Sequence, residues 1–214
     1  ANRDRLRDRI ERGGEGFDNI AGMVGWENII MSTLNTPANK RFEGMTVQDI
    51  AKARGTDPVD CVCDMLIEEN CAITMIDFIT CDEDIARILN CGFASVISDS
   101  IYPASGRPHP RLYGTYARII QRFVGERRDM TLEAAVKAMT YTPAKALNIA
   151  DRGLLRDGLC ADVNVFDPAE VKERGSYADP DKCAAGMDYV FVNGKPAIAA
   201  GEITGGAFGQ VIRR

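Results

Sequence analysis

The sequence predicts a mixed α/β fold followed by a β-rich C-terminal segment. Over the first 150 residues, short apolar runs typical of buried strands alternate with amphipathic helical patterns. This alternation, with its short connections, favours parallel strands covered by helices. After residue 153 the pattern changes to short strands separated by turn sequences, among them the hairpin signal Asn193-Gly194. We therefore expect two structural parts, residues 1–152 and residues 153–214.

The N-terminal third predicts helices on both sides of a strand. The first dozen residues have a helical pattern, and residues 28–33 read as a strand. Thr46 with Asp49 resembles a capping box that opens a short helix. Asp57 before Pro58 predicts the start of a second helix, with proline at its tolerated first position. The apolar stripe expected for this second helix consists of Val59, Cys63, Leu66 and Ile67.

The central segment predicts two strands, residues 71–79 and 93–98, with a helix between them. Thr80 and Glu83 resemble a capping box at the start of that helix. Its inward face is expected to consist of Ile85, Ile88 and Leu89. The second strand ends directly at Asp99. A buried strand that delivers one carboxylate at its C-terminal end is how an α/β barrel presents a reactive acid.

The remaining elements follow from capping and turn signals. Thr131, and Thr142 before Pro143, are expected to cap two helices. Asn193-Gly194 is expected to join two strands as a two-residue hairpin. The expected elements are helices over residues 115–125, 132–141 and 144–149, and strands over residues 160–167, 188–192 and 195–199.

Composition excludes several classes of function. The formal net charge of -5 argues against a nucleic-acid partner, which would need a basic face. The apolar runs have the length of strands, so no membrane span or membrane partner is expected. Seven cysteines without a secretion signal predict buried or semi-buried free thiols and a cytoplasmic location. Cys61 and Cys63 are the closest pair, but two helical residues at this spacing face different ways and make a poor metal clip.

Several segments resemble the metal-dependent amidohydrolase superfamily. Residues 140–167 resemble the junction at which the last barrel helices give way to a small β-sandwich. The block His109-Pro-Arg-Leu-Tyr-Gly-Thr-Tyr resembles a signature of the N-acyl-D-amino-acid deacylases, or D-aminoacylases. Residues 190–205 resemble the closing hairpin of that family. The narrower resemblance spans most of the chain.

This resemblance implies a fold and an activity. The fold would be the C-terminal strands and helices of a TIM (β/α) barrel in residues 1–152, with a family-specific α/β segment at roughly 28–79, followed by strands of a small β-sandwich in residues 153–214. The activity would be zinc-dependent hydrolysis of the amide bond of N-acyl-D-amino acids, releasing a D-amino acid and a carboxylate. Because His109 is the only histidine, most zinc ligands are expected from an absent N-terminal part. The isolated chain is then expected to be inactive.

The same resemblance assigns roles to three residues. Asp99 would be the catalytic acid and a metal ligand, moving a proton between water and the leaving nitrogen. Arg111 would bind the substrate carboxylate, because a guanidinium can hold a carboxylate with two hydrogen bonds. His109, between two prolines on a stiff extended segment, is a candidate substrate-binding residue or a structural one. Asp162 and Asp167 are expected to be turn and strand-end residues rather than catalytic acids.

Two departures and two alternatives remain open. Ser100 stands where the family commonly has glycine, and residues 101–107 depart from its usual loop, so the choice of substrate is open. The chain could instead be a non-catalytic truncated homologue that serves as a scaffold or interaction module, or an amidohydrolase for cyclic amides. The expected partner is a small-molecule substrate. A partial barrel also leaves unpaired strand edges, which predicts self-association or pairing with the missing N-terminal half.

Overall fold

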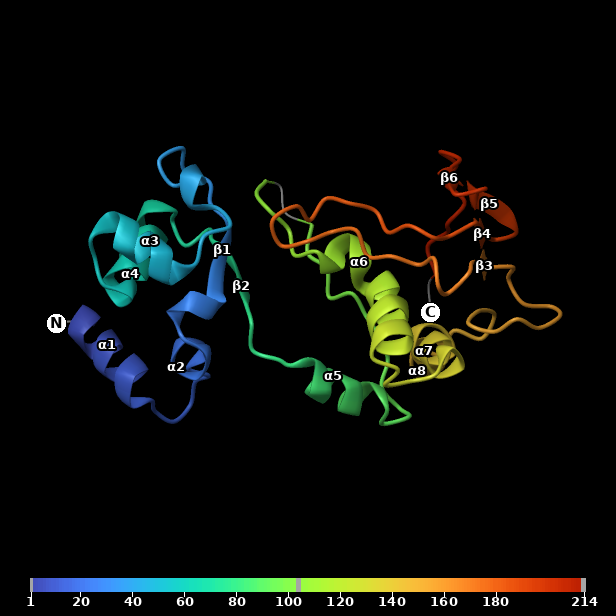
Figure 1. Ribbon diagram of the computed structural model, residues 1–214, viewed down its shortest axis with the longest axis horizontal. Helices are drawn as coiled ribbons and strands as arrows, with labels where there is room; N and C mark the ends of the chain where they lie inside the picture. The colour runs from blue at the N-terminus through green and yellow to red at the C-terminus, as the bar shows by residue number, and fades with distance from the viewer. Residues whose placement is uncertain (1, 103–104, 213–214) are drawn as a thin grey trace. The chain divides into compact units, whose positions relative to one another are not determined.

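The computed structural model describes residues 2–102 and 105–212 and divides into two compact units (Figure 1). The first unit contains Ala1–Thr80, Ser100–His109 and Ser176–Asp181, and the second contains Cys81–Asp99, Pro110–Gly175 and Lys182–Arg214. These units do not follow the division at residue 152 that the sequence predicts. That division refers to the barrel and sandwich of a complete enzyme, and it stays a prediction.

The first unit is a small α/β arrangement. Its elements are α1 (Asn2–Arg12), α2 (Ile20–Val24), η1 (Trp26–Asn28), β1 (Ile29–Thr33), η2 (Lys40–Phe42), α3 (Val47–Arg54), α4 (Pro58–Glu68) and β2 (Thr74–Asp77). The two predicted strands are present, but β1 and β2 pair antiparallel, with Ile30 opposite Ile76. The prediction of parallel strands is therefore wrong for this pair. Antiparallel hydrogen bonds are slightly more stable per residue, and nothing in a two-stranded sheet requires a parallel crossover.

The core of the first unit lies among β1, α3 and α4, and the two helices lie side by side (Figure 1). Both predicted caps are confirmed: the Asp49 N–H donates to Thr46 Oγ1 over 3.1 Å, and the Val59 N–H donates to the Asp57 carboxylate over 3.0 Å. The predicted stripe of α4 is wrong in part. The buried residues of α4 are Val59, Cys61 and Met65, whereas Leu66 and Ile67 are exposed. The middle of α4 is apolar on several faces, so periodicity alone did not select the buried one.

A buried carboxylate fixes the loop that follows β1. Glu69 is only 3% exposed and follows the last turn of α4. It accepts hydrogen bonds from the Asn35 N–H over 2.6 Å, from the N–H and hydroxyl of Thr36, and from Asn39 Nδ2 over 2.8 Å. These donors compensate the carboxylate for the water it has lost.

The second unit combines five helical segments with a four-stranded sheet. Its elements are α5 (Asp82–Leu89), α6 (Arg111–Arg118), the π-helical η3 (Ile119–Glu126), α7 (Leu132–Met139), α8 (Tyr141–Ala146), β3 (Val163–Val165), β4 (Tyr189–Val192), β5 (Lys195–Ala199) and β6 (Glu202–Ile203). The strands follow one another antiparallel in the order β3-β4-β5-β6. The predicted hairpin is confirmed, because Asn193 and Gly194, both with positive φ, join β4 to β5.

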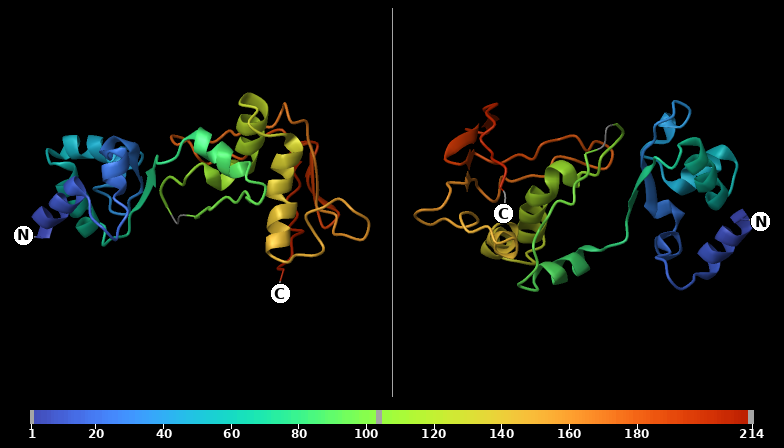
Figure 2. Two further views of the ribbon diagram at one scale, coloured as in Figure 1. Left: turned by 90° about the horizontal axis from the view of Figure 1, so that it is seen from below. Right: turned by 180° about the vertical axis from the view of Figure 1, so that it is seen from behind.

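The helices predicted for the second unit are present, but their observed bounds differ from the predicted ones. The predicted helix 115–125 begins earlier, at Arg111, and changes to π-helical geometry at Ile119. Thr131 caps α7 as predicted, since its hydroxyl accepts from the Ala134 N–H over 3.2 Å. The next helix, α8, begins at Tyr141 and not after Pro143. In Figure 2, α7 and α8 follow one another as a nearly continuous rod.

The predicted capping box of α5 is wrong. Cys81 occupies the N-cap position without a side-chain cap, and Asp82 in the first turn pairs with Arg122 instead. The arginine that pairs with Asp82 lies 40 residues further along the chain, and the local sequence does not indicate this pairing. Of the predicted inward residues, Ile85 and Leu89 pack against the core, but Ile88 is 62% exposed.

The predicted strand 93–98 is irregular in the structure. Val96 is buried and its N–H donates to the Ala138 carbonyl over 2.9 Å, whereas Phe93 and Ile97 are exposed. A central strand of a parallel sheet needs a neighbour on each side for its backbone hydrogen bonds. Within residues 2–102 and 105–212, no strand flanks this segment.

The cysteines and helix lengths bear on two further expectations. All seven cysteines are free thiols, as predicted. The expectation that they are buried or semi-buried is confirmed for Cys61, Cys63 and Cys160 but is wrong for the other four, which are exposed. None of the helices in the described part of the chain is long and apolar enough to span a membrane.

Candidate active site

Asp99 lies at the end of the irregular segment in a left-handed backbone conformation, with φ +46°. Its carboxylate is largely exposed, and Oδ2 lies 2.8 Å from a terminal nitrogen of the Arg111 guanidinium. An aspartate tolerates this conformation better than most residues, because its short side chain can hydrogen-bond locally. The structure therefore brings together two of the three residues that the sequence predicts for the site.

Arg111 is the first residue of α6, which begins after Pro110. Proline suits this position because its fixed φ matches the helix and no backbone donor is lost. A cation is electrostatically disfavoured in the first turn of a helix. The Asp99 carboxylate offsets that cost. Because both side chains are more than a third exposed, the pair contributes at most about 1 kcal/mol and can exchange partners readily.

His109 belongs to the first unit and makes aromatic contacts there. Its ring meets the ring of Tyr177 edge to face, with 5.2 Å between centroids. Tyr177 in turn meets Phe78 at 4.8 Å. The start of the same loop is bound to β1, since the Arg107 N–H donates to the Ser32 carbonyl over 3.0 Å and the Ser32 hydroxyl donates to the Arg107 carbonyl over 2.5 Å.

Tyr177 is the residue that sequence reasoning missed. It lies 68 residues after His109 in a stretch with no periodic pattern, and nothing local indicates that these two rings meet. The one usable signal is Ser176 with Asp179, a spacing typical of a tight turn. That signal predicts the turn but not its neighbour.

Asp162 and Asp167 have the structural roles predicted for them. Asp162 accepts a hydrogen bond from the Asn193 N–H over 2.8 Å and pairs with Arg152, which ties the start of β3 to the hairpin. Asp167 accepts from the Ala169 N–H over 2.9 Å within a turn. Neither carboxylate joins the pair of Asp99 and Arg111.

The described residues do not by themselves form a metal centre. A closed zinc site takes four ligands, and a catalytic one takes three protein ligands and a water molecule. Asp99 could supply one oxygen, but no group of three or more histidine, cysteine or acidic residues in the described chain could hold an ion. A metal at Asp99 would need most of its ligands from elsewhere.

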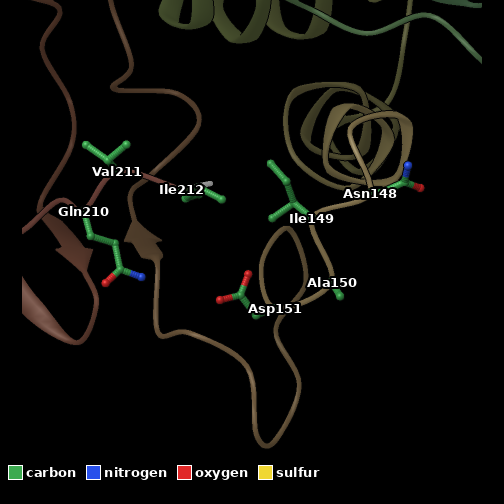
Figure 3. A pocket seen from close by; sticks show the side chains of 7 residues that line it. All are labelled: Asn148, Ile149, Ala150, Asp151, Gln210, Val211 and Ile212. Atoms are coloured by element: carbon green, nitrogen blue, oxygen red, sulfur yellow. The ribbon is translucent and has the colours of Figure 1, made fainter. Parts of the chain in front are cut away.

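Two surface hollows lie apart from Asp99 and Arg111. The first, of about 510 Å³, is lined by residues 148–151 and 210–212 (Figure 3). Its one carboxylate, Asp151, accepts a hydrogen bond from the Cys160 thiol at 3.2 Å, which raises the pKa of that thiol. The second, of about 540 Å³, lies beside Phe42, whose ring is stacked by the guanidinium of Arg54. The second hollow contains the carboxylates Asp64 and Glu68, and Glu68 is already paired with Arg54 over 2.8 Å.

Comparison with known proteins identifies the family. Residues 35–198, more than half of the chain, match the model of the amidohydrolase family. The chain therefore belongs to the amidohydrolase family. Within this family, its curated and solved relatives are D-aminoacylases and N-acyl-D-amino-acid deacylases.

The chain is 36% identical over 165 residues to an N-acyl-D-glutamate deacylase of Alcaligenes xylosoxydans xylosoxydans, an alignment that covers 77% of this chain and 32% of that protein. A solved D-aminoacylase described with a binuclear metal centre matches with a TM-score of 0.77 and 32% identity, over 87% of this chain and 38% of that one.

A second solved structure is the N-acyl-D-glutamate deacylase from Bordetella bronchiseptica, complexed with zinc and a phosphonate that mimics the tetrahedral intermediate. It matches with a TM-score of 0.75 and 35% identity, over 88% of this chain and 38% of that one. The chain thus spans about a third of the length of the curated relatives it matches. Its mixture of helices and strands agrees with the amidohydrolase fold of the solved relatives.

Proposed function

We propose that this chain forms part of a zinc-dependent hydrolase that cleaves the amide bond of N-acyl-D-amino acids. The observation that carries the proposal is the pair of Asp99 and Arg111, held 2.8 Å apart within a chain of the amidohydrolase family. The pair combines a group that can move a proton with a group that can hold a carboxylate. An N-acyl amino acid offers both an amide bond and a free carboxylate.

In this proposal each residue has a defined task. The Asp99 carboxylate takes a proton from the attacking water and later delivers it to the leaving nitrogen, and it also serves as one metal ligand. The Arg111 guanidinium binds the substrate carboxylate, which must replace Asp99 as its partner. That exchange is inexpensive because the existing pair is exposed. When bound, zinc would make the water more acidic, and its remaining ligands would come from parts of the relatives that this chain does not match.

The remaining architectural predictions belong to the same proposal. Residues 1–152 would form the C-terminal part of a TIM barrel and residues 153–214 part of a β-sandwich. The irregular segment 93–98 would then become a strand once neighbours flank it. The chain would pair with the missing part or with itself, and it would act in the cytoplasm.

The test compares two aspartates in the complete gene product supplied with zinc. Asp99→Asn is expected to lower kcat for N-acetyl-D-amino acids by about 10²- to 10⁴-fold, because a positioned proton carrier contributes that factor. Asp167→Asn, which keeps the turn acceptor, is expected to retain full activity. The assay should include D and L enantiomers and a cyclic amide.

Three results would count against the proposal. Full activity of the Asp99→Asn variant would remove Asp99 from the mechanism. Turnover of the cyclic amide alone would favour a different amidohydrolase. A complete gene product that turns over no amide would favour the scaffold interpretation. That interpretation is the second candidate because no metal-binding group lies among the described residues.

A further inference from the structure

The first observation concerns the segment 170–173, which lies against the helix formed by α6 and η3 within the second unit (Figure 1). Val171 is completely buried and belongs to one apolar cluster with Ala117 of α6. Two residues further on, the Glu173 N–H donates to the side-chain oxygen of Gln121 over 2.9 Å. The segment is therefore bound to this helix both by apolar packing and by a hydrogen bond.

The backbone of the same segment is also fixed from its other side. Lys172 and Ala185 exchange two backbone hydrogen bonds of 3.0 Å each. Gly186 follows with φ +89°, and a Cβ there would lie 2.2 Å from the Glu170 carbonyl oxygen, so this position requires glycine. The segment therefore cannot move along the helix without breaking these backbone bonds.

Gly114 is the point at which the segment approaches α6 most closely. It is buried in the interior of the helix, where glycine is less favourable than any residue except proline. A Cβ at Gly114 would lie 2.8 Å from Cγ and 2.8 Å from Oε1 of Glu173, closer than real Cβ contacts are found. The absence of a side chain at Gly114 thus makes room for the side chain of Glu173.

Glu173 is itself held in place. Its side chain is only 15% exposed, and its Oε2 accepts a hydrogen bond from Nη1 of Arg118 over 3.1 Å. If Glu173 turned away from α6, Arg118 would lose its nearer carboxylate and keep only a contact of 3.9 Å with Asp82. A residue larger than glycine at position 114 must therefore either displace the helix or break this ion pair.

Arg111 lies on the same face of α6 as this contact. Arg111, Gly114 and Arg118 stand at positions i, i+3 and i+7, which share one side of a helix. Arg111 is therefore about one helical turn, roughly 5 Å, before the contact. The Thr115 hydroxyl donates to the Arg111 carbonyl over 2.7 Å, which adds to the bonds of this turn. A displacement of the helix at Gly114 is thus passed on to Arg111.

We propose that Glu173 is a positioning residue of the candidate active site, which acts through its contact with Gly114 by setting the place of α6 and of the Arg111 side chain. The effect on substrate binding rests on the proposed function. The contact and its effect on Arg111 do not, because both can be measured without turnover.

The first measurement is the kinetics of the complete gene product with zinc and N-acetyl-D-amino acids. Gly114→Ala and Glu173→Ala are each expected to raise KM about three- to tenfold with little change in kcat, because Arg111 would hold the substrate carboxylate in ground state and transition state alike. Tenfold corresponds to about 1.4 kcal/mol, part of what one charge-assisted hydrogen bond contributes. The double variant is expected to have the KM of Glu173→Ala, because the added methyl group no longer meets the Glu173 side chain.

Two control variants separate this contact from general effects on the helix. Gly125→Ala also places a methyl group on a helical glycine, but the nearest atom, the Ile120 carbonyl oxygen, lies at an ordinary 3.6 Å, so KM should not change. Glu173→Gln keeps the size of the side chain above Gly114 and an acceptor for Arg118. It is expected to keep the KM of the unmodified enzyme.

The second measurement follows hydrogen exchange in residues 111–118 of the complete gene product. Gly114→Ala is expected to speed exchange in the unmodified background, because the methyl group and the Glu173 side chain cannot share the space. In the Glu173→Ala background the same substitution is expected to slow exchange, because alanine is the better helix former. Such a reversal requires that the two residues contact each other.

The third measurement observes Arg111 directly. Its Nε–H signal in the NMR spectrum of the complete gene product is assigned by its loss in Arg111→Lys. The signal is expected to shift in Glu173→Ala and to stay in place in Glu173→Gln.

Each outcome decides the inference. A change of hydrogen exchange in the same direction in both backgrounds would overturn the contact. An unchanged KM in Glu173→Ala, or a double variant whose KM reflects the product of the two single effects, would overturn the positioning role. If Gly114→Ala does not fold, Glu173→Ala and Glu173→Gln still decide through KM. If the unmodified enzyme hydrolyses no N-acyl-D-amino acid, the proposed function fails, and an Arg111 signal that does not shift in Glu173→Ala then overturns the inference.

Discussion

At the residue scale, Glu69 shows how a buried charge can stabilise a loop. Burial alone would raise the pKa of Glu69, but hydrogen bonds from Thr36, Asn39 and the backbone N–H of Asn35 outweigh it and lower the pKa from its ordinary 4.5 to about 2. Because the folded pKa is depressed, this stabilisation is complete above pH 4.5 and is lost as the pH falls to about 2. At neutral pH it amounts to about 3 kcal/mol.

Replacing this carboxylate tests that account. Glu69→Gln is expected to lower the free energy of unfolding of the first unit by about 2–3 kcal/mol at pH 7. The amide keeps one acceptor oxygen, but its NH2 group then faces the N–H and O–H groups that donate to the carboxylate. It should also flatten the loss of stability between pH 4.5 and pH 2. Trp26, the only tryptophan, packs against this core and reports urea unfolding by fluorescence. Glu11→Gln on the exposed face of α1 is the control, and an unchanged pH slope in Glu69→Gln would contradict the assignment.

At the scale of elements, the helix formed by α6 and η3 is bound at both ends to the segment 82–99. Arg111 at its start pairs with Asp99, and Arg122 in η3 donates through Nε to Asp82 over 2.7 Å. Hydrogen bonding from Arg122 lowers the pKa of Asp82, and the nearby Arg118 and Arg127 act in the same direction. Asp82 is only 17% exposed, so its ion pairs are screened less by water than the pair at Asp99.

Asp82→Asn is therefore expected to destabilise the second unit by about 2 kcal/mol, since it leaves three guanidinium groups without their shared carboxylate. Slower-exchanging amides of α6 and η3 should lose protection in hydrogen-exchange measurements. Asp84→Asn lies in the same helix turn and removes an exposed pair with Arg87, while its amide oxygen can still accept from the Cys81 thiol, so it should cost less than about 0.5 kcal/mol. Equal effects from the two variants would refute a special role for Asp82.

At the scale of the whole molecule, both units expose large apolar side chains. The large apolar side chains that are at least two thirds exposed are Met23, Ile67, Phe93, Ile97, Ile101, Tyr102, Leu155, Ile203 and Val211. Isolated exposed apolar residues are ordinary, but Phe93 and Ile97 lie on one irregular segment whose backbone also lacks strand neighbours within the described residues. Unpaired backbone beside exposed apolar side chains favours association with another chain.

We expect this chain to self-associate, with a sedimentation coefficient that rises with concentration. The double substitution Phe93→Glu and Ile97→Glu should shift it toward monomer, because charges oppose strand-to-strand association. The matched control replaces Leu155 and Ile203, which lie on other segments, with glutamate. A chain that sediments as a single monomer over about a tenfold concentration range would contradict the expectation.

Local signals determined much of this structure. The caps at Thr46, Asp57 and Thr131 and the hairpin at Asn193 follow from hydrogen bonds and backbone preferences that reach only two or three residues along the chain. The sequence also offered Asp99 and Arg111 as candidates, Asp99 at the end of an expected strand and Arg111 in a block that resembles a family signature. Such features depend on neighbours in sequence, so one chain is enough to predict them.

Other features depended on the tertiary structure. The face that α4 buries, the antiparallel pairing of β1 with β2 and the irregular path of residues 93–98 depend on which segments come to lie alongside. The contact of Tyr177 with His109 is of the same kind, because a ring packs against whatever surface the fold brings to it. Pairings between distant segments are selected by the free energy of the whole fold, and no short stretch of residues determines that free energy.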